Sequence, residues 1–226
     1  RNLREHARGS RSIRLVNLDP ASRDAQDYDL DLCDHITVAE VMEGCDFGPN
    51  GGLFAALEEA VGNLDALELH AFEGEYVIFD CPGQIELFLH SDIMQACIDH
   101  VARFSRVAIA YLTDATNLAV PAKHLYASLC ATLSMSRFLL PVVNILTKTD
   151  LVEEEALERI LAGEDLLCPE EAADALARTA VEYVSANGML GYMPLNWKDD
   201  ETVENVLLQL DMVLQRFDDL EPAEGG

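Results

Sequence analysis

The chain of 226 residues is long enough for one sizeable domain, and half of its residues are apolar, as in an ordinary globular protein. Its 41 acidic and 15 basic residues give a formal net charge of -26, and a field of this sign repels nucleic-acid phosphates and anionic lipid. We therefore expect no direct binding to nucleic acid and none to membranes. Six of the first 23 residues are arginine, which we interpret as the solvated face of a first helix and the loop after it.

The six cysteines are scattered, with no Cys-x-x-Cys and no paired Cys/His spacing. A disulfide framework and a structural zinc site are therefore poorly supported. No apolar run reaches membrane-spanning length, and no signal peptide is visible. We expect a reduced, intracellular compartment.

Strand and helix patterns alternate along the chain. Runs rich in Val, Ile and Leu, typical of strands buried on both faces of a parallel sheet, occupy residues 12–18, 75–80, 106–114 and 141–150. Helical periodicity marks residues 53–67, 85–104, 121–138 and 199–217. This alternation predicts an α/β fold with a doubly wound, mostly parallel sheet. We expect one domain over residues 1–220, with two short helices inserted at 151–180 and a disordered tail at 221–226.

A glycine-rich turn, "DFGPNGG" at residues 46–52, precedes the first of these helices. Pro49 fixes its own φ, whereas the three glycines permit positive φ and a close approach of the backbone. Asn50 can hydrogen-bond locally or present its amide to another molecule. Taken alone, the stretch fits an ordinary turn before a helix.

Three of the predicted strands end in an aspartate beside small or turn-forming residues. These are Asp19, Asp80 and Asp150. In doubly wound folds, ligands bind beyond the carboxyl ends of the strands. We therefore expect the three carboxylates to converge at one edge of one parallel sheet.

The sequence "DCPGQ" begins at the end of the strand predicted for residues 75–80. The carboxylate of Asp80 can hold Mg²⁺ through water. Gly83 lets the backbone approach a terminal phosphate and donate its N–H, and Gln84 can orient an attacking water. Asp-x-x-Gly is a weak signal alone, and its place after an apolar strand strengthens it.

A second motif, "TKTD" at residues 147–150, follows another apolar strand. The carboxylate of Asp150 can accept hydrogen bonds from the N1–H and the N2 amino group of guanine, two donors that adenine does not offer there. The stem of Lys148 can lie along the purine face. A solvated loop explains this motif equally well alone, but not in combination with the motif from Asp80 to Gln84.

The segments "VNLDPA" (16–21), "FGPNGG" (47–52), "FDCPGQIELF" (79–88) and "NILTKTDL" (144–151) together resemble the GPN-loop GTPases. The resemblance runs from about residue 1 to 220 and keeps the order of the motifs in the family. It implies a fold of the P-loop NTPase type. The segment 194–207 is similar to the family's segment before its last helix, which places Pro194 and Leu195 beside the base.

The resemblance also implies a role for each motif residue. In this family the GPN loop, here Gly48, Pro49 and Asn50, reaches across a dimer interface toward the nucleotide phosphates of the partner. Asp19 matches the switch aspartate near magnesium or the attacking water. The remaining matches are Asp80 with the magnesium-site aspartate, Gln84 with the water-positioning glutamine, and Lys148 and Asp150 with the guanine-reading pair.

One departure from the family pattern stands out. The family opens with a strand and a phosphate loop that ends in Gly-Lys-Ser/Thr, whereas Gly9-Ser10 is followed by Arg11. We expect the chain to begin just downstream of that element. A fragment and a degenerate subunit that lost nucleotide binding are the two explanations, and we favour the fragment because loss of an interior strand would leave ladder groups unpaired on two neighbours.

The resemblance implies a GTPase that binds GTP and Mg²⁺ and acts as a homodimer, or as a heterodimer with another GPN-loop GTPase. For a eukaryotic source it implies a role in RNA polymerase II assembly and nuclear import, in the cytoplasm with shuttling to the nucleus. The alternative is a non-hydrolysing partner that lends its GPN loop to an active homologue. A third reading is an ATP-dependent assembly protein, against which the guanine-reading pair argues.

Overall fold

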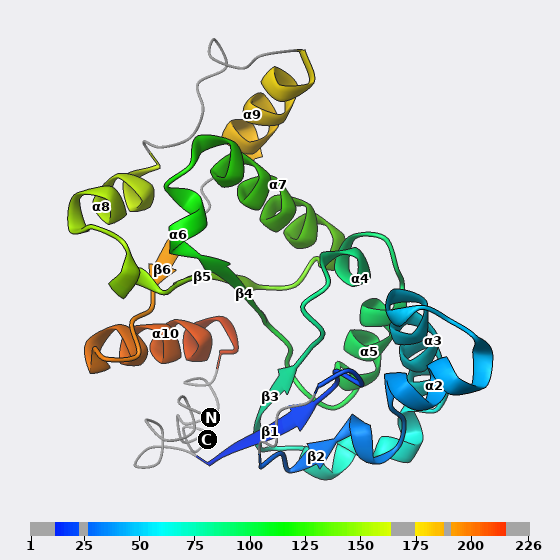
Figure 1. Ribbon diagram of the computed structural model, residues 1–226. Helices are drawn as coiled ribbons and strands as arrows, with labels where there is room; N and C mark the ends of the chain where they lie inside the picture. Colours follow the sequence, from blue (N-terminus) through cyan, green and yellow to red (C-terminus); the bar gives the residue numbers. More distant parts are fainter. Residues whose placement is uncertain (1–11, 23–26, 164–174, 188–190, 216–226) are drawn as a thin grey trace, which may run out of the picture. The chain divides into compact units, whose positions relative to one another are not determined.

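The computed structural model describes residues 12–22, 27–163, 175–187 and 191–215 (Figure 1). The chain divides into two compact units, Arg1–Arg106 and Val107–Gly226, each of which contains a parallel sheet. The tail predicted at 221–226 lies outside the described residues, and the single domain predicted over residues 1–220 stays a prediction.

The sheet of the first unit has the order β2-β1-β3 among the described residues. Its strands are β1 (Ile13–Asn17), β2 (Leu30–Asp31) and β3 (Tyr76–Asp80), and all pairs are parallel. In the register, Asn17 lies opposite both Asp31 and Asp80, so the three strands end at the same level. The two longer strands confirm the predicted runs, and the two-residue β2 was not predicted.

In chain order, the helices of the first unit are η2 (Leu32–Asp34), α2 (Val38–Cys45), α3 (Pro49–Gly62), η3 (Leu64–Leu67), η4 (Leu69–Phe72), α4 (Ile85–Leu89) and α5 (Ile93–Val101). They include two packed pairs, α2 with α3 and α3 with α5. The helix predicted over 85–104 is wrong as one element. It breaks before α5 because the N–H of Ile93 donates to the Ser91 hydroxyl at 3.1 Å, a local bond that competes with a continuous helix.

Residues 46–52 were predicted as a glycine-rich turn before a helix, and this prediction is partly wrong because the helix already begins within the segment. α3 begins at Pro49, at the N1 position where a missing N–H costs nothing, and ends at Gly62. Gly48 is extended, with φ -72°, and none of the three glycines of this segment has a positive φ. Among the described glycines, positive φ is found at Gly74 and Gly163. The predicted close approach is real at Gly52, where an added Cβ would lie 2.7 Å from Met42 Cγ of α2.

This contact predicts a stability difference between two neighbouring glycines. Both Gly52→Ala and Gly51→Ala gain up to about 1 kcal/mol of helix propensity. The new Cβ of Gly52→Ala meets Met42 and Val38, whereas that of Gly51→Ala meets ordinary contacts at 3.6 Å. Overpacking costs about 1–3 kcal/mol, so we expect Gly52→Ala to be less stable than Gly51→Ala by about that amount. Urea unfolding followed by circular dichroism measures the difference, and equal midpoints would contradict this packing.

The sheet of the second unit has the order β4-β5-β6 among the described residues. Its parallel strands are β4 (Ile109–Asp114), β5 (Val142–Thr147) and β6 (Tyr192–Pro194). β5 is central and largely buried, whereas β4 lies at an edge and leaves 63% of Leu112 exposed. The three-residue β6 was not predicted.

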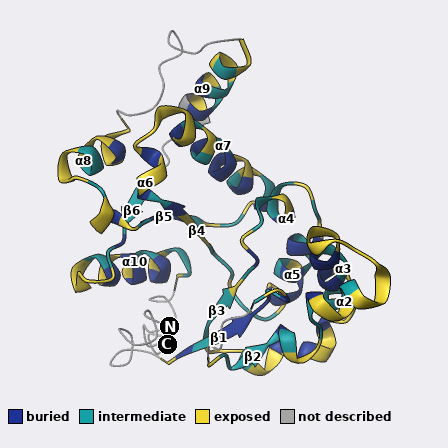
Figure 2. Cartoon of the chain, in the orientation of Figure 1, coloured by how far each residue is buried: buried dark blue, intermediate teal, exposed yellow. Residues whose placement is uncertain are grey.

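Helices cover both faces of this second sheet, with α7 on one side and α10 on the other (Figure 1). The helices of the unit are α6 (Ala115–Leu118), α7 (Pro121–Phe138), η5 (Thr149–Leu151), α8 (Glu154–Ala162), α9 (Ala175–Asn187) and α10 (Asp200–Val213). α10 buries Val203, Val206, Leu207 and Leu210 on one face, which confirms a helix within the predicted range 199–217. Figure 2 shows the same inward burial on α7 and α10.

The predicted insertion at 151–180 contains α8 and the beginning of α9, with residues 164–174 outside the described part. α9 buries Val181 and Val184 and packs against α7 of the same unit. Parallel sheets flanked by helices confirm the predicted α/β class. Within the described ranges, the length and apolar content of every helix fall short of those of a bilayer-spanning segment.

Candidate functional site

Acidic residues gather at the carboxyl edge of the first sheet. Asp80 ends β3, and Asp19 follows the end of β1, the neighbouring strand. The N–H of Leu18 donates to the carbonyl of Asp80 at 2.8 Å, which ties the two strand ends together. The structure therefore brings these two predicted site residues to one edge.

Asp19 is held in a tight turn. Its Oδ1 accepts the N–H of Ala21 at 2.9 Å, and its carbonyl accepts the N–H of Ser22 at 3.1 Å. Its own N–H donates to the Oδ1 of Asn17 at 2.9 Å. These three hydrogen bonds fix the backbone of Asp19 and the orientation of its half-buried carboxylate.

Asp80 is exposed, and its Oδ2 accepts the hydroxyl of Tyr28 at 2.7 Å. Burial, with a contribution from this hydrogen bond, raises the pKa of Tyr28 above its usual value, so the phenol is a neutral donor at pH 7. Sequence reasoning missed Tyr28, because it lies 52 positions from Asp80 and carries no motif of its own.

The donor set fits a magnesium ion. Mg²⁺ is usually held by one or two carboxylates, with phosphates and waters completing an octahedron. Asp19 and Asp80 supply such a pair at one edge. The described part of the chain contains no cluster of three or more His, Cys, Asp or Glu side chains that could hold a metal.

The connection from β3 to α4 carries the next two predicted residues. Gly83 is exposed, and a Cβ added there would meet nothing within 4 Å, so its backbone is open to a ligand. Gln84 is the N-cap residue of α4, but its side chain does not cap the helix. The Gln84 amide is therefore not committed to the helix terminus.

The residues of the GPN segment lie at the N-terminus of α3. Gly48 is the N-cap, and Pro49 and Asn50 are the first two helical residues. All three are exposed, so the Asn50 amide is outside the core of its own unit. Exposure is what a group that contacts a second molecule requires.

The carboxyl edge of the second sheet carries the other motif. Lys148 follows β5 with φ 58°, and its Nζ donates to Asp114 Oδ2 at 2.7 Å. The Lys198 Nζ donates to Asp150 Oδ2 at 2.8 Å. Hydrogen bonding to these lysines lowers the pKa of Asp114 and of Asp150, so both acids are ionised at neutral pH.

Sequence reasoning missed both ion-pair partners. Asp114 also ends an apolar strand, the signal that selected the other acids, so it could have been found. Lys198 lies 48 positions from Asp150, and nothing in its neighbourhood identifies its partner.

Leu195 lies beside the motif at 147–150. Its N–H donates to the Leu146 carbonyl at 2.8 Å, and its carbonyl accepts the Thr149 hydroxyl at 3.2 Å. Pro194, the last residue of β6, lies opposite Leu146. The predicted neighbourhood of Pro194 and Leu195 is therefore present, and their contact with a base stays a prediction.

The sequence is similar to proteins of one family over nearly its whole length. It is 34% identical over 230 residues to GPN-loop GTPase 3 of Yarrowia lipolytica, a match that covers 95% of this chain and 85% of that protein. The protein of the same name from Dictyostelium discoideum is 33% identical, with 95% and 80% covered. The chain belongs to the GPN-loop GTPase family.

Two further comparisons agree with this family. A family model described as "Conserved hypothetical ATP binding protein" matches residues 1–216. The crystal structure of a GTPase in apo form from Pyrococcus abyssi aligns with a TM-score of 0.74 and 21% identity, covering 92% of this chain and 88% of that one. This likeness shows that the fold is α/β of the P-loop NTPase type.

The family's motif residues thus occupy two sheet edges. Asp19 and Asp80, followed by Gly83 and Gln84, belong to the first unit, and Lys148 and Asp150 belong to the second. The convergence of Asp19, Asp80 and Asp150 on one ligand stays a prediction.

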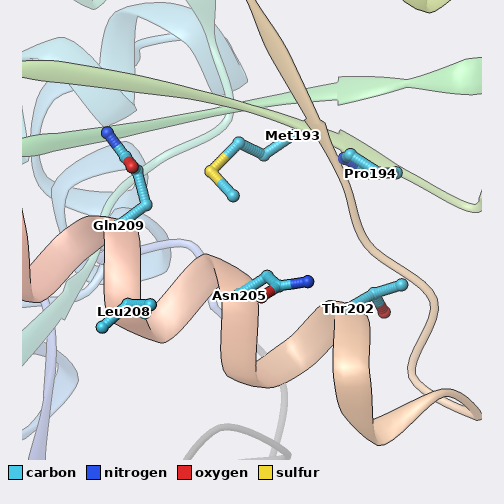
Figure 3. Close-up of a pocket in the computed structure, with 6 residues that line it drawn as sticks. All are labelled: Met193, Pro194, Thr202, Asn205, Leu208 and Gln209. Atoms are coloured by element: carbon cyan, nitrogen blue, oxygen red, sulfur yellow. The ribbon is translucent and has the colours of Figure 1, made fainter.

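A cavity of about 230 Å³ lies between β6 and α10 (Figure 3). It is lined by Met193, Pro194, Thr202, Asn205, Leu208 and Gln209. Pro194 is the one lining residue that sequence reasoning had placed near the base. The predicted catalytic and metal-binding residues do not line this cavity.

Proposed function

We propose that this GPN-loop GTPase binds GTP with Mg²⁺ and hydrolyses it to GDP and phosphate. The observation that carries the proposal is the pair Asp19 and Asp80 at one carboxyl edge, with Gly83 and Gln84 directly after β3. Phosphoryl transfer depends mainly on positioning and on electrostatic stabilisation, and these residue types supply both.

The four predicted site residues at this edge of the first sheet each have a part in the proposed chemistry. Asp80 would hold Mg²⁺, and Asp19 would hold the metal or the attacking water. When bound, the metal would supply positive charge to the developing negative charge on the phosphate oxygens. The Gly83 N–H donates to the terminal phosphate, and Gln84 orients the water for attack.

The second unit supplies base recognition. The ionised Asp150 accepts the two donors on the edge of guanine, and the Lys148 stem lies along the ring. Adenine offers neither of these donors to the carboxylate, which penalises the wrong base. Asp150 forms an ion pair with Lys198, and Lys148 forms one with Asp114.

The protein acts as a dimer in this proposal, either with itself or with another GPN-loop GTPase. The exposed Asn50 at the start of α3 supports this part, because it can approach the phosphates of a partner's nucleotide. RNA polymerase II subunits are the proposed clients, and the proposed location is the cytoplasm with shuttling to the nucleus.

A second candidate function is a non-hydrolysing partner that lends its GPN loop to an active homologue. The exposed Asn50 at the start of α3 supports this candidate as well, because lending the GPN loop does not require hydrolysis by the same chain. The two candidates differ in one measurable property, which is turnover by the protein alone.

Phosphate release from GTP and from ATP tests the proposal. We expect the full-length protein to turn over GTP in the presence of Mg²⁺ and to be much slower with ATP. Turnover that appears only after a second GPN-loop GTPase is added would support the non-hydrolysing partner. Equal turnover of both nucleotides would contradict guanine recognition.

The hydrogen bond from Tyr28 to Asp80 predicts a change in magnesium affinity. Tyr28→Phe removes the hydroxyl group that donates to Asp80, which leaves the Asp80 carboxylate less well oriented. Loss of such a supporting hydrogen bond costs about 10-fold in metal affinity. The Mg²⁺ dependence of GTP turnover measures this effect. Tyr126→Phe, at a tyrosine of the second unit that exposes 63% of its surface, is the control, and an equal response of both variants would contradict the role of Tyr28.

A further inference from the structure

Asn17 is a fully buried polar residue at the end of the central strand β1. Its exposed fraction is 0%, and the residues before it in the strand are mostly apolar. A buried amide is costly unless its donors and acceptor are satisfied, so its partners indicate what it does.

The partners of Asn17 all lie at the carboxyl edge of the sheet. Its Nδ2 donates to Asp31 Oδ1 at 2.7 Å and to the carbonyl of Asp19 at 3.1 Å. Its Oδ1 accepts the N–H of Asp19 at 2.9 Å. One side chain therefore holds both backbone polar groups of Asp19 and a carboxylate of the adjacent strand.

Asp31 is itself fixed from a second direction. Its Oδ1 also accepts the N–H of Cys33 at 2.9 Å, as the N-cap of η2. In the register, Asn17 lies opposite Asp31 on one side and Asp80 on the other. Its amide links the end of β2 to the turn that begins at Asp19. Together with the hydrogen bond from the Leu18 N–H to the Asp80 carbonyl at 2.8 Å, this amide connects the ends of the three strands.

We propose that Asn17 is a positioning residue for GTP hydrolysis, which it serves by fixing the Asp19 carboxylate relative to Asp80. The inference rests on the proposed function, because it assigns Asp19 to the metal or the attacking water. Displacement of a catalytic group by about 1 Å can cost about 100-fold in rate. An amide is suited to the task because it donates and accepts at once, as both backbone groups of Asp19 require.

The chain contains a matched control in Asn144. This residue is also a buried asparagine, 5% exposed, in the central strand β5 of the other sheet. Its Nδ2 lies 3.9 Å from Met135 Sδ, and its Oδ1 has no hydrogen-bond partner among the described residues. Asn144→Ala therefore removes a buried amide without touching the edge that carries Asp19.

The test compares steady-state GTP hydrolysis by the full-length wild-type protein, Asn17→Ala and Asn144→Ala. We expect Asn17→Ala to lower kcat about 30- to 100-fold with KM for GTP within about twofold, because the lost function is orientation and not binding. We expect kcat of Asn144→Ala to stay within about twofold. A kcat of Asn17→Ala equal to that of wild type, or an equal loss in both variants, would overturn the inference.

A double-mutant cycle separates positioning from a loss of stability. If Asn17 acts through Asp19, adding Asn17→Ala to Asp19→Asn causes little further loss of kcat, whereas independent effects multiply. Asn17→Ser, which keeps one hydroxyl donor and acceptor, replaces Asn17→Ala in the cycle if the alanine variant does not fold. Absence of GTP turnover by wild type would count against the proposed function itself, whereas wild-type turnover with multiplying losses would remove only the role of Asn17.

Discussion

Replacing Gln84 by leucine is expected to slow GTP turnover by about 100- to 1,000-fold while GTP affinity stays within about threefold. Gln84 follows β3 at the first sheet edge, and its side chain does not cap α4. In the proposed mechanism its amide orients the attacking water, an interaction that matters only as the bond to phosphate forms. Single-turnover phosphate release and binding of a fluorescent GTP analogue measure the two quantities separately.

Gln95→Leu is the control for this prediction. Gln95 is a glutamine of α5 in the same unit, and its amide donates to Asp99 at 2.8 Å on the helix surface. We expect its turnover to match that of wild type. Unchanged turnover in Gln84→Leu, or an equal loss in both variants, would remove Gln84 from the mechanism.

Replacing Asp150 by asparagine is expected to abolish most of the preference for guanine. The new amide group offers a donor to the N1–H of guanine, where the carboxylate offered an acceptor. A mismatch of this kind in a site built for hydrogen bonding costs about 100-fold or more in discrimination. Competition between GTP and ATP for one site measures the change. Xanthosine triphosphate, which has a carbonyl in place of the 2-amino group, should gain affinity.

Lys198→Ala is the control for this prediction, because it removes the ion pair between Lys198 and Asp150 and keeps the Asp150 carboxylate. The Lys198 side chain is 80% exposed, and exposed ion pairs contribute little. We therefore expect Lys198→Ala to change the GTP-to-ATP preference by less than about threefold. Equal preference in wild type and Asp150→Asn would contradict the assignment of Asp150 to the base.

The long elements of the fold could be predicted because their patterns are local. β3 and β5 are apolar runs that end at motif residues, and α7 matches its predicted range of 121–138. β2 and β6 have two and three residues, too few to show a period of their own. They are strands because a neighbouring strand pairs with them, a tertiary effect that one segment does not reveal.

The candidate site could be predicted in its motif residues but not in their supporting partners. Asp80 ends β3, whereas Asp19 and Asp150 follow the ends of β1 and β5 within three residues, and such strand ends are visible in the sequence. The pairing of Tyr28 with Asp80 depends on how the chain returns to the sheet. The GPN segment was predicted as a turn, whereas Pro49 and Asn50 are the first residues of α3. The sequence did not distinguish the two, because Pro is common both in turns and in the first turn of a helix.

Calorimetric titration of the full-length protein with GTP and with ATP tests the central claim most directly. We expect one GTP bound per chain, at least about 100-fold tighter than ATP, with affinity that falls when Mg²⁺ is chelated. Equal affinity for the two nucleotides would contradict the assignment of Asp150 to the base, and GTP binding that does not respond to Mg²⁺ would contradict the assignment of Asp19 and Asp80 to the metal.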